Sequence, residues 1–170
     1  MLSMRHILLS LGALSIPLVS SAPATSGARS EVPEVIPGPG LPSLASLGLT
    51  SEQLFALGKP ESSEDDQSLM AVTRCGDQYG NVNNAIACYN YLRNLGRTDC
   101  RVPIGQRSVI MCTAGDIRIE SSGVGASSWC EHVAMAVLYT VDHCTRPSQD
   151  VAGYAPAYGN GDLIVGTQRN

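Results

Sequence analysis

Six cysteines constrain the fold of this 170-residue chain more strongly than any other feature of its sequence. They are even in number, are separated by 11 to 17 residues, and include no C-x-x-C pair. An even number of widely spaced cysteines is typical of a disulfide framework in a secreted protein, whereas zinc sites favour close cysteine pairs. The sequence therefore predicts three disulfides, and no metal site, from Cys75, Cys88, Cys100, Cys112, Cys130 and Cys144.

The N-terminus has the pattern of a secretory signal peptide. Arg5 and His6 form a short basic start, residues 7–19 are apolar, and small residues follow from Ser20 to Ala24. The apolar run has 13 residues, whereas a helix that spans a bilayer needs about 20. We therefore assign residues 1–22 as a signal peptide rather than a retained membrane anchor. We expect a secreted, extracellular protein without a membrane span.

Residues 23–68 have the composition of a disordered acidic leader, rich in Pro, Ser and Gly. Seven acids and two basic residues give this segment a net charge of −5, whereas residues 70–170 carry eight arginines and eight acids. A segment of this kind buries too little apolar surface to offset its chain entropy. Because the remainder of the chain is balanced in charge, we expect neither nucleic acid nor an anionic membrane as its partner.

One short stretch of the leader has a different pattern. Thr50 can cap a two-turn helix, with Gln53 at its third position and Gly58 as its terminator. This pattern predicts either a transient turn or a segment that docks against the domain. The sequence leaves both open.

Residues 69–170 predict one cysteine-stapled α+β domain. A helix follows Asn81 and ends at Gly96, and a second opens on a Ser128/Glu131 capping box and stops before Pro147. Strand-like runs occupy residues 69–75, 100–102, 108–111, 116–120 and 163–167. The order β-α-β-β-α-β predicts a two-layer sandwich, with a four-stranded antiparallel sheet and both helices on one of its faces.

That topology suggests one disulfide pairing among the many that six cysteines allow. The first strand and the second helix end at the same edge of the sheet, which favours Cys75–Cys144. The second strand and the second helix begin at the opposite edge, which favours Cys100–Cys130. Cys88 and Cys112 are then left to pair through the core, and we treat the whole pairing as a hypothesis.

Residues that could carry chemistry are few. Beyond the signal peptide only His132 and His143 remain, and they lie 11 residues apart on one helix, too far to act on one bond. No G-x-S-x-G motif occurs. The glycine-rich run from Gly123 lacks the lysine and the spacing of a phosphate-binding loop, and Asp116 with Glu120 has no sign of a buried catalytic pair. We therefore expect a protein that is not an enzyme and needs no cofactor.

Three aromatic residues are candidates for ligand binding. Trp129 lies at the start of the second helix, and Tyr154 and Tyr158 flank Pro156 before the last strand. Such rings stack on sugars in many secreted modules, but packing inside the fold is the commoner use of aromatic side chains.

Four segments carry a resemblance to known proteins: Asn84–Leu92 (NAIACYNYL), Val109–Gly115 (VIMCTAG), Val133–Cys144 and Ala157–Leu163 (AYGNGDL). In cysteine order and element order they resemble small cysteine-rich secreted proteins of filamentous fungi. These include effector-like proteins of the necrosis-inducing type and killer-toxin-like α/β sandwiches. A terminal disulfide of that family has no counterpart here, because no cysteine follows Cys144.

The resemblance implies an extracellular fungal effector or toxin with a virulence-type role, which acts on a host or a competing microbe. It brings no catalytic residue with it. We expect a monomer that works by binding, and the alternatives are a module that binds carbohydrate in cell walls or a small secreted hydrolase. The partner is a host or microbial target that the sequence does not name, with cell-wall glycan as one candidate.

Overall fold

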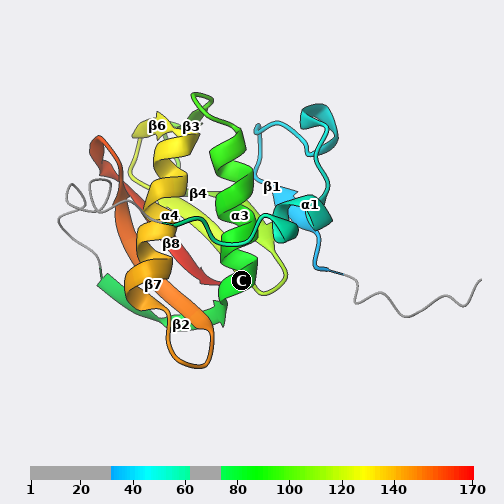
Figure 1. Ribbon diagram of the computed structural model, residues 1–170. Helices are drawn as coiled ribbons and strands as arrows, with labels where there is room; N and C mark the ends of the chain where they lie inside the picture. The colour runs from blue at the N-terminus through cyan, green and yellow to red at the C-terminus, as the bar shows by residue number, and fades with distance from the viewer. Residues whose placement is uncertain (1–31, 62–73) are drawn as a thin grey trace, which may run out of the picture. The chain divides into compact units, whose positions relative to one another are not determined.

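A computed structural model describes residues 32–61 and 74–170 (Figure 1). The signal peptide expected at 1–22 lies outside the described residues, as do the remaining parts of the leader. The described helical elements are η1 (Ala45–Leu47), α1 (Ser51–Ala56), α3 (Val82–Asn94) and α4 (Cys130–Cys144). The described strands are β1 (Val35–Pro37), β2 (Arg74–Asn81), β3 (Asp99–Arg101), β4 (Ser108–Ala114), β5 (Ile117–Ser122), β6 (Ser127–Trp129), β7 (Asp150–Ala157) and β8 (Asn160–Arg169).

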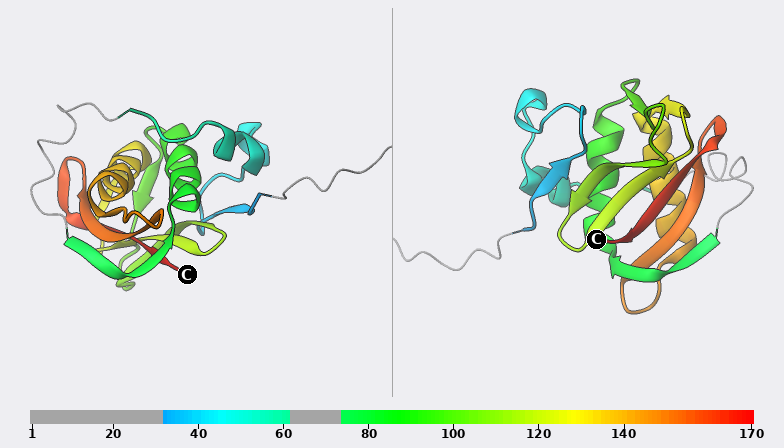
Figure 2. Two further views of the ribbon diagram at one scale, coloured as in Figure 1. Left: turned by 60° about the horizontal axis from the view of Figure 1, so that its bottom comes forward. Right: turned by 180° about the vertical axis from the view of Figure 1, so that it is seen from behind.

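The strands form two antiparallel sheets. The larger has six strands in the order β1-β4-β5-β8-β7-β2, and β3 pairs with β6 in a sheet of two. Helices α3 and α4 lie side by side on one face of the larger sheet (Figure 2). The α+β class and the antiparallel sheet are confirmed. The expected order β-α-β-β-α-β is wrong, because β3 leaves the main sheet to pair with β6, and the segment with Tyr154 forms the strand β7.

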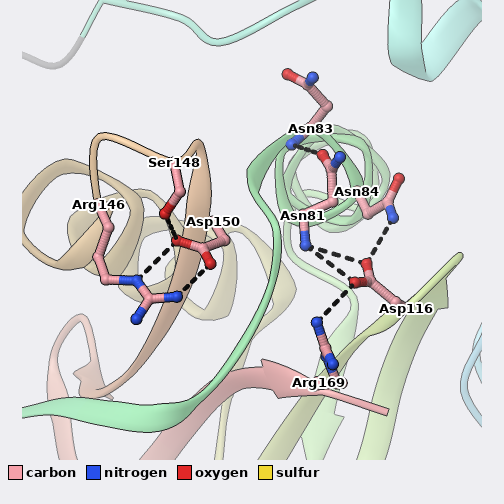
Figure 3. Close-up of polar contacts among 8 residues, drawn as sticks. All are labelled: Asn81, Asn83, Asn84, Asp116, Arg146, Ser148, Asp150 and Arg169. Carbon is pink, nitrogen blue, oxygen red and sulfur yellow. Dashed lines mark hydrogen bonds and ion pairs between the residues drawn. The ribbon is translucent and has the colours of Figure 1, made fainter.

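Helix α3 begins as its sequence predicts, with help from a distant carboxylate. The Asn81 side chain accepts a hydrogen bond from the Asn83 amide at 2.8 Å. Asp116, in the turn between β4 and β5, accepts from the Asn81 amide at 3.0 Å and from Asn84 Nδ2 at 2.8 Å (Figure 3). Arg169, at the end of β8, lies 3.9 Å from the same carboxylate. One acid therefore joins the first turn of α3 to the sheet.

Helix α4 begins differently from the expectation. Trp129, not Ser128, is its N-cap residue, and no side chain caps it. The backbone amides of Cys130 and Glu131, which have no partner within the helix, donate to the carbonyls of Thr98 and Gly96, at 2.9 and 3.0 Å. The predicted capping box is therefore wrong, because backbone carbonyls of the segment after α3 already accept hydrogen bonds from these amides. Ser128 is left in β6, opposite Cys100.

The three disulfides are Cys75–Cys144, Cys88–Cys112 and Cys100–Cys130. This is the pairing that the topology suggested. Both cysteines of the second and third disulfides are fully buried. Each disulfide joins a helix to a strand, and the ends of α4 are thereby fixed to β2 and to β3.

Residues 32–61 form what we call the N-terminal strap, and the expectation of a disordered leader is wrong for them. Strand β1 pairs with β4 at one edge of the main sheet. Helix α1 lies against α3 and buries Leu54 completely (Figure 1). Thr50 and Gln53 make the reciprocal capping box. Of the two alternatives that the sequence left open for this stretch, docking is the correct one.

Two polar side chains of α3 donate hydrogen bonds to backbone carbonyls of the strap. Asn90 of α3 donates to the carbonyls of Leu54 and Gly58, at 2.9 and 3.1 Å. Tyr91, which has no exposed surface, donates its hydroxyl to the Pro42 carbonyl at 2.7 Å. Burial raises the pKa of Tyr91 to about 12. A buried donor without its acceptor costs free energy, so the strap is part of the hydrogen-bonding of the core.

The loop between α4 and β7 is held by a charged cluster. Arg146 Nε donates to Asp150 Oδ1 at 2.8 Å, and Ser148 Oγ donates to the same oxygen at 2.7 Å (Figure 3). The Arg146 guanidinium also lies 3.5 Å from the centre of the Tyr79 ring on β2. The hydrogen bonds from Arg146 and Ser148 hold the pKa of Asp150 at about 2, below its ordinary 3.8.

This depressed pKa predicts a loss of stability in acid. A carboxyl group whose pKa is lower in the folded state than in the unfolded state stabilises the folded state at pH values above its unfolded-state pKa. This stabilisation is lost as the pH falls through the folded-state pKa. We expect the gap in urea midpoint between wild type and Asp150→Asn to be constant above about pH 4 and to close towards about pH 2. Urea titrations of both proteins across this range measure it, and a gap that does not change with pH would contradict it.

Candidate functional site

The two-stranded sheet presents one face to solvent. Side chains alternate across a strand, and Cys100, in the middle of β3, is fully buried. Its neighbours Asp99 and Arg101 therefore point outward together, and they form an ion pair. Trp129 lies opposite Asp99 and Ser127 lies opposite Arg101 in the ladder. These four side chains form one small outward surface, which the buried Cys100–Cys130 disulfide supports from beneath.

This surface is the floor of a hollow of about 570 Å³. His132 from the first turn of α4 and the turn between β7 and β8 complete its walls. Asn160, the first residue of β8, donates through Nδ2 to the Ser127 carbonyl at 2.7 Å, which holds the start of β8 against β6. We call this hollow the Trp129 groove, and its defining residues are Asp99, Arg101, Ser127, Trp129, His132 and Asn160.

A second hollow of about 410 Å³ adjoins the Trp129 groove. Ser127 and Asn160 line both. The glycine-rich loop between β5 and β6 forms its wall, together with Asp162. Gly125 in this loop has φ +72°, a conformation that favours glycine. The glycine-rich run therefore shapes a hollow at the surface.

Ser128 and His132 form a hydrogen-bonded pair beside the groove. Ser128 Oγ lies 3.2 Å from His132 Nδ1 and donates to the Tyr158 carbonyl at 3.4 Å. The Tyr158 ring meets the His132 ring edge-on, with 5.2 Å between their centres. The Ser128 hydroxyl therefore links β6 to α4 and to the turn between β7 and β8.

The structure separates the three aromatic candidates. Trp129 lies in the groove with 44% of its surface exposed. Tyr158 lies behind the groove, against His132. Tyr154 is elsewhere: its ring covers Gly166 on the face of the main sheet opposite the helices, and its hydroxyl donates to Gln168 at 2.7 Å. The structure therefore brings Trp129 and Tyr158 to one region and leaves Tyr154 out of it.

The groove also contains residues that sequence reasoning missed. Asp99 and Arg101 flank Cys100 at alternate positions of a strand, and this signal could have placed them on one face. Asn160 is the first residue of β8. Its contact with Ser127 joins residues 33 positions apart.

Other candidates have structural partners away from the groove. Asp116 holds the first turn of α3, whereas Glu120 accepts a hydrogen bond from Gln168 Nε2 at 3.0 Å. His143 stacks on Tyr139, with 3.9 Å between the ring centres. The Asp116/Glu120 pair considered from the sequence therefore does not share a site.

Within the residues that the structure describes, no group of three or more His, Cys, Asp or Glu side chains could hold a metal ion. In the same part of the chain, no helix is long and apolar enough to cross a membrane.

Comparisons with known proteins give one result. Searches of curated proteins and of solved structures return no match. A family model described as a domain of unknown function, DUF8794, matches residues 69–169, from β2 to the end of β8, and so covers the groove but not the N-terminal strap. Because the matched segment is more than half of the chain, the protein belongs to the DUF8794 family.

Proposed function

We propose that this is a secreted, effector- or toxin-like protein that acts outside the cell by binding a host or microbial target through the Trp129 groove. The observation that carries the proposal is the exposed Trp129, placed on a rigid floor beside polar side chains. Binding sites commonly combine an aromatic surface with a few convergent polar groups. The groove has this composition.

The way the floor is held also supports binding. The Cys100–Cys130 disulfide lies directly under the outward face of β3 and β6, and the amides of Cys130 and Glu131 bind the segment after α3. A surface fixed in advance loses little conformational entropy when a partner docks.

Replacing Trp129 with alanine is expected to abolish the biological response while the fold remains intact. The purified chain from residue 23 would be applied to plant tissue and to competing microbes, and necrosis or growth inhibition scored. Because more than half of the Trp129 surface is buried, its removal should lower the free energy of unfolding by about 1 to 3 kcal/mol, so circular dichroism is used to check that the variant is folded. Leu57→Ala is the matched control, since Leu57 is 62% exposed on the strap and outside the groove.

Two results would contradict the proposal. One is a wild-type protein to which neither tissue nor microbe responds, or a Trp129→Ala protein that keeps full activity. The other is an intrinsic hydrolase activity that disappears in Ser128→Ala or His132→Ala, which would make the pair at the groove catalytic.

A further inference from the structure

We infer that the ligand of the Trp129 groove is a neutral oligosaccharide, with one sugar ring stacked on Trp129 and the chain continuing into the second hollow. This inference rests on the proposed function, because it assumes that the groove is where the target binds. It adds the chemical class of the target.

The aromatic platform is the first argument. Trp129 ends the short strand β6 and leaves 44% of its surface uncovered, on the same outward face as Asp99. An indole ring combines a large apolar face with a polar edge. A sugar ring offers the complementary shape, with C–H bonds on its face and hydroxyls around its rim. Stacking of the two would cover the indole and leave the hydroxyls within reach of the floor.

The charge of the groove selects a neutral ligand. Asp99 and Arg101 are the charged side chains of the floor, and they pair with one another. A phosphate or carboxylate ligand calls for an unpaired guanidinium, and a basic peptide calls for an unpaired carboxylate. A sugar hydroxyl both donates and accepts, so it can bind to either member of the pair without separating them.

The remaining polar groups suit hydroxyls as well. Ser127 and Ser128 contribute hydroxyls, Asn160 an amide and His132 an imidazole to the lining. Each of these groups offers a hydrogen-bond donor, an acceptor or both. Ser127, Ser128 and Asn160 are neutral, and Asp162 adds one carboxylate to the second hollow, which can accept from sugar hydroxyls but would repel an anionic ligand.

The adjoining second hollow indicates a chain of sugars. The hollows of about 570 and 410 Å³ meet at Ser127 and Asn160. Gly123, Gly125 and Ala126 add little bulk to the second hollow, and its other side chains are those of Val124, Ser127, Asn160 and Asp162. A monosaccharide would fill one of the two, whereas an oligosaccharide can occupy both. Affinity should therefore rise with chain length.

Trp129 is the only tryptophan of the chain, so its fluorescence reports on the groove alone. The mature protein would be titrated with soluble chitin, β-glucan and cellulose oligosaccharides of one to six units, and with sulfated and uronic-acid oligosaccharides for comparison. We expect a blue shift of the emission with at least one neutral series, and tighter binding of the longer members. Retention on the matching insoluble polysaccharide should follow the same preference.

Variants separate the groove from the rest of the surface. Trp129→Ala should weaken binding, measured by calorimetry, by about tenfold or more, as loss of a central aromatic anchor does. Asp99→Asn should also weaken it, and because the Asp99–Arg101 pair is exposed the fold should be unaffected. Tyr154→Phe should bind as wild type does, since Tyr154 contacts Gln168 away from the groove.

The inference is overturned if no neutral saccharide shifts the emission or retains the protein, if only charged saccharides bind, or if Trp129→Ala binds as well as wild type. An experiment that contradicts this inference can be distinguished from one that contradicts the proposed function. If Trp129→Ala removes the biological response but no saccharide binds, the groove is still the target site and its target is not a saccharide.

Discussion

Replacing Leu54 with alanine is expected to lower the free energy of unfolding of the whole protein by about 2 to 5 kcal/mol. Leu54 is the one buried residue of α1 and has no exposed surface. Its removal would leave a cavity between α1 and α3 that surrounding side chains fill only in part. Guanidinium or urea unfolding, followed by circular dichroism, measures the effect.

Leu57→Ala is the matched control for this prediction. Leu57 belongs to the same short segment and loses the same atoms on mutation, but it is 62% exposed. Its replacement should change the free energy of unfolding by about 0.5 kcal/mol or less. The contrast between the two leucines therefore tests whether the strap is packed on the helices in solution.

Equal, small effects of both substitutions would show that the strap is detached from the helices in solution, as the disordered-leader interpretation requires. A large effect of Leu54→Ala alone would establish residues 32–61 as part of the cooperative fold. It would agree with the contacts that the strap makes with Asn90 and Tyr91, and with the ion pair between Lys59 and Asp142.

The helices could be predicted from sequence because their signals are local. Apolar residues recur at three- and four-residue steps along α3, and Ala85, Cys88, Tyr89 and Leu92 are all buried. The same holds along α4 from Cys130 to Cys144. The disulfide pairing, which was suggested by the strand and helix ends expected to meet at the sheet edges, is the one observed.

The strap could not be predicted because its order comes from distant contacts. The run Pro37–Gly40 has the composition of a linker, yet Gly38 donates its amide to the Met111 carbonyl at 2.9 Å. A Cβ at Gly38 would lie 2.0 Å from the Ile110 carbonyl oxygen, so glycine permits this close approach. Proline at position 37 is compatible with an edge strand. Composition alone does not distinguish such a segment from a flexible one.

The candidate site was predictable only in part, for the same reason. The sequence identified Trp129 as a candidate binding residue, but its neighbours Asp99 and Arg101 come from a strand about 30 positions earlier. Pairing of β3 with β6 depends on the Cys100–Cys130 disulfide and on the backbone bonds to residues 96–98. Those contacts replaced the capping box that the local sequence favoured, and they turned β6 into the floor of the groove.

Limited reduction of the native protein is expected to open Cys75–Cys144 before the other disulfides. Cys75 is exposed on β2, whereas Cys88, Cys112, Cys100 and Cys130 are fully buried. Thiol–disulfide exchange requires access of the attacking thiolate to sulfur. Graded treatment with reductant, alkylation and peptide mapping should therefore find the first labels on Cys75 and Cys144.

Loss of this disulfide should also destabilise the fold substantially. It closes a loop with a sequence separation of 69 residues, for which the chain-entropy model gives about 4 kcal/mol. Its strand is weakly attached otherwise, because the pairing of β2 with β7 is interrupted between Cys75 and Gly80. The double variant Cys75→Ala/Cys144→Ala measures the loss by urea unfolding.

The groove should survive this change, because it lies at the opposite end of α4. The helix has 15 residues from Cys130 to Cys144, which corresponds to about 21 Å along its axis. Trp129 emission of the double variant should match that of wild type before unfolding begins. Labelling of Cys100 or Cys130 at the lowest reductant concentration, or a shifted emission in the double variant, would contradict this account, since the floor of the groove would then depend on the far end of the helix.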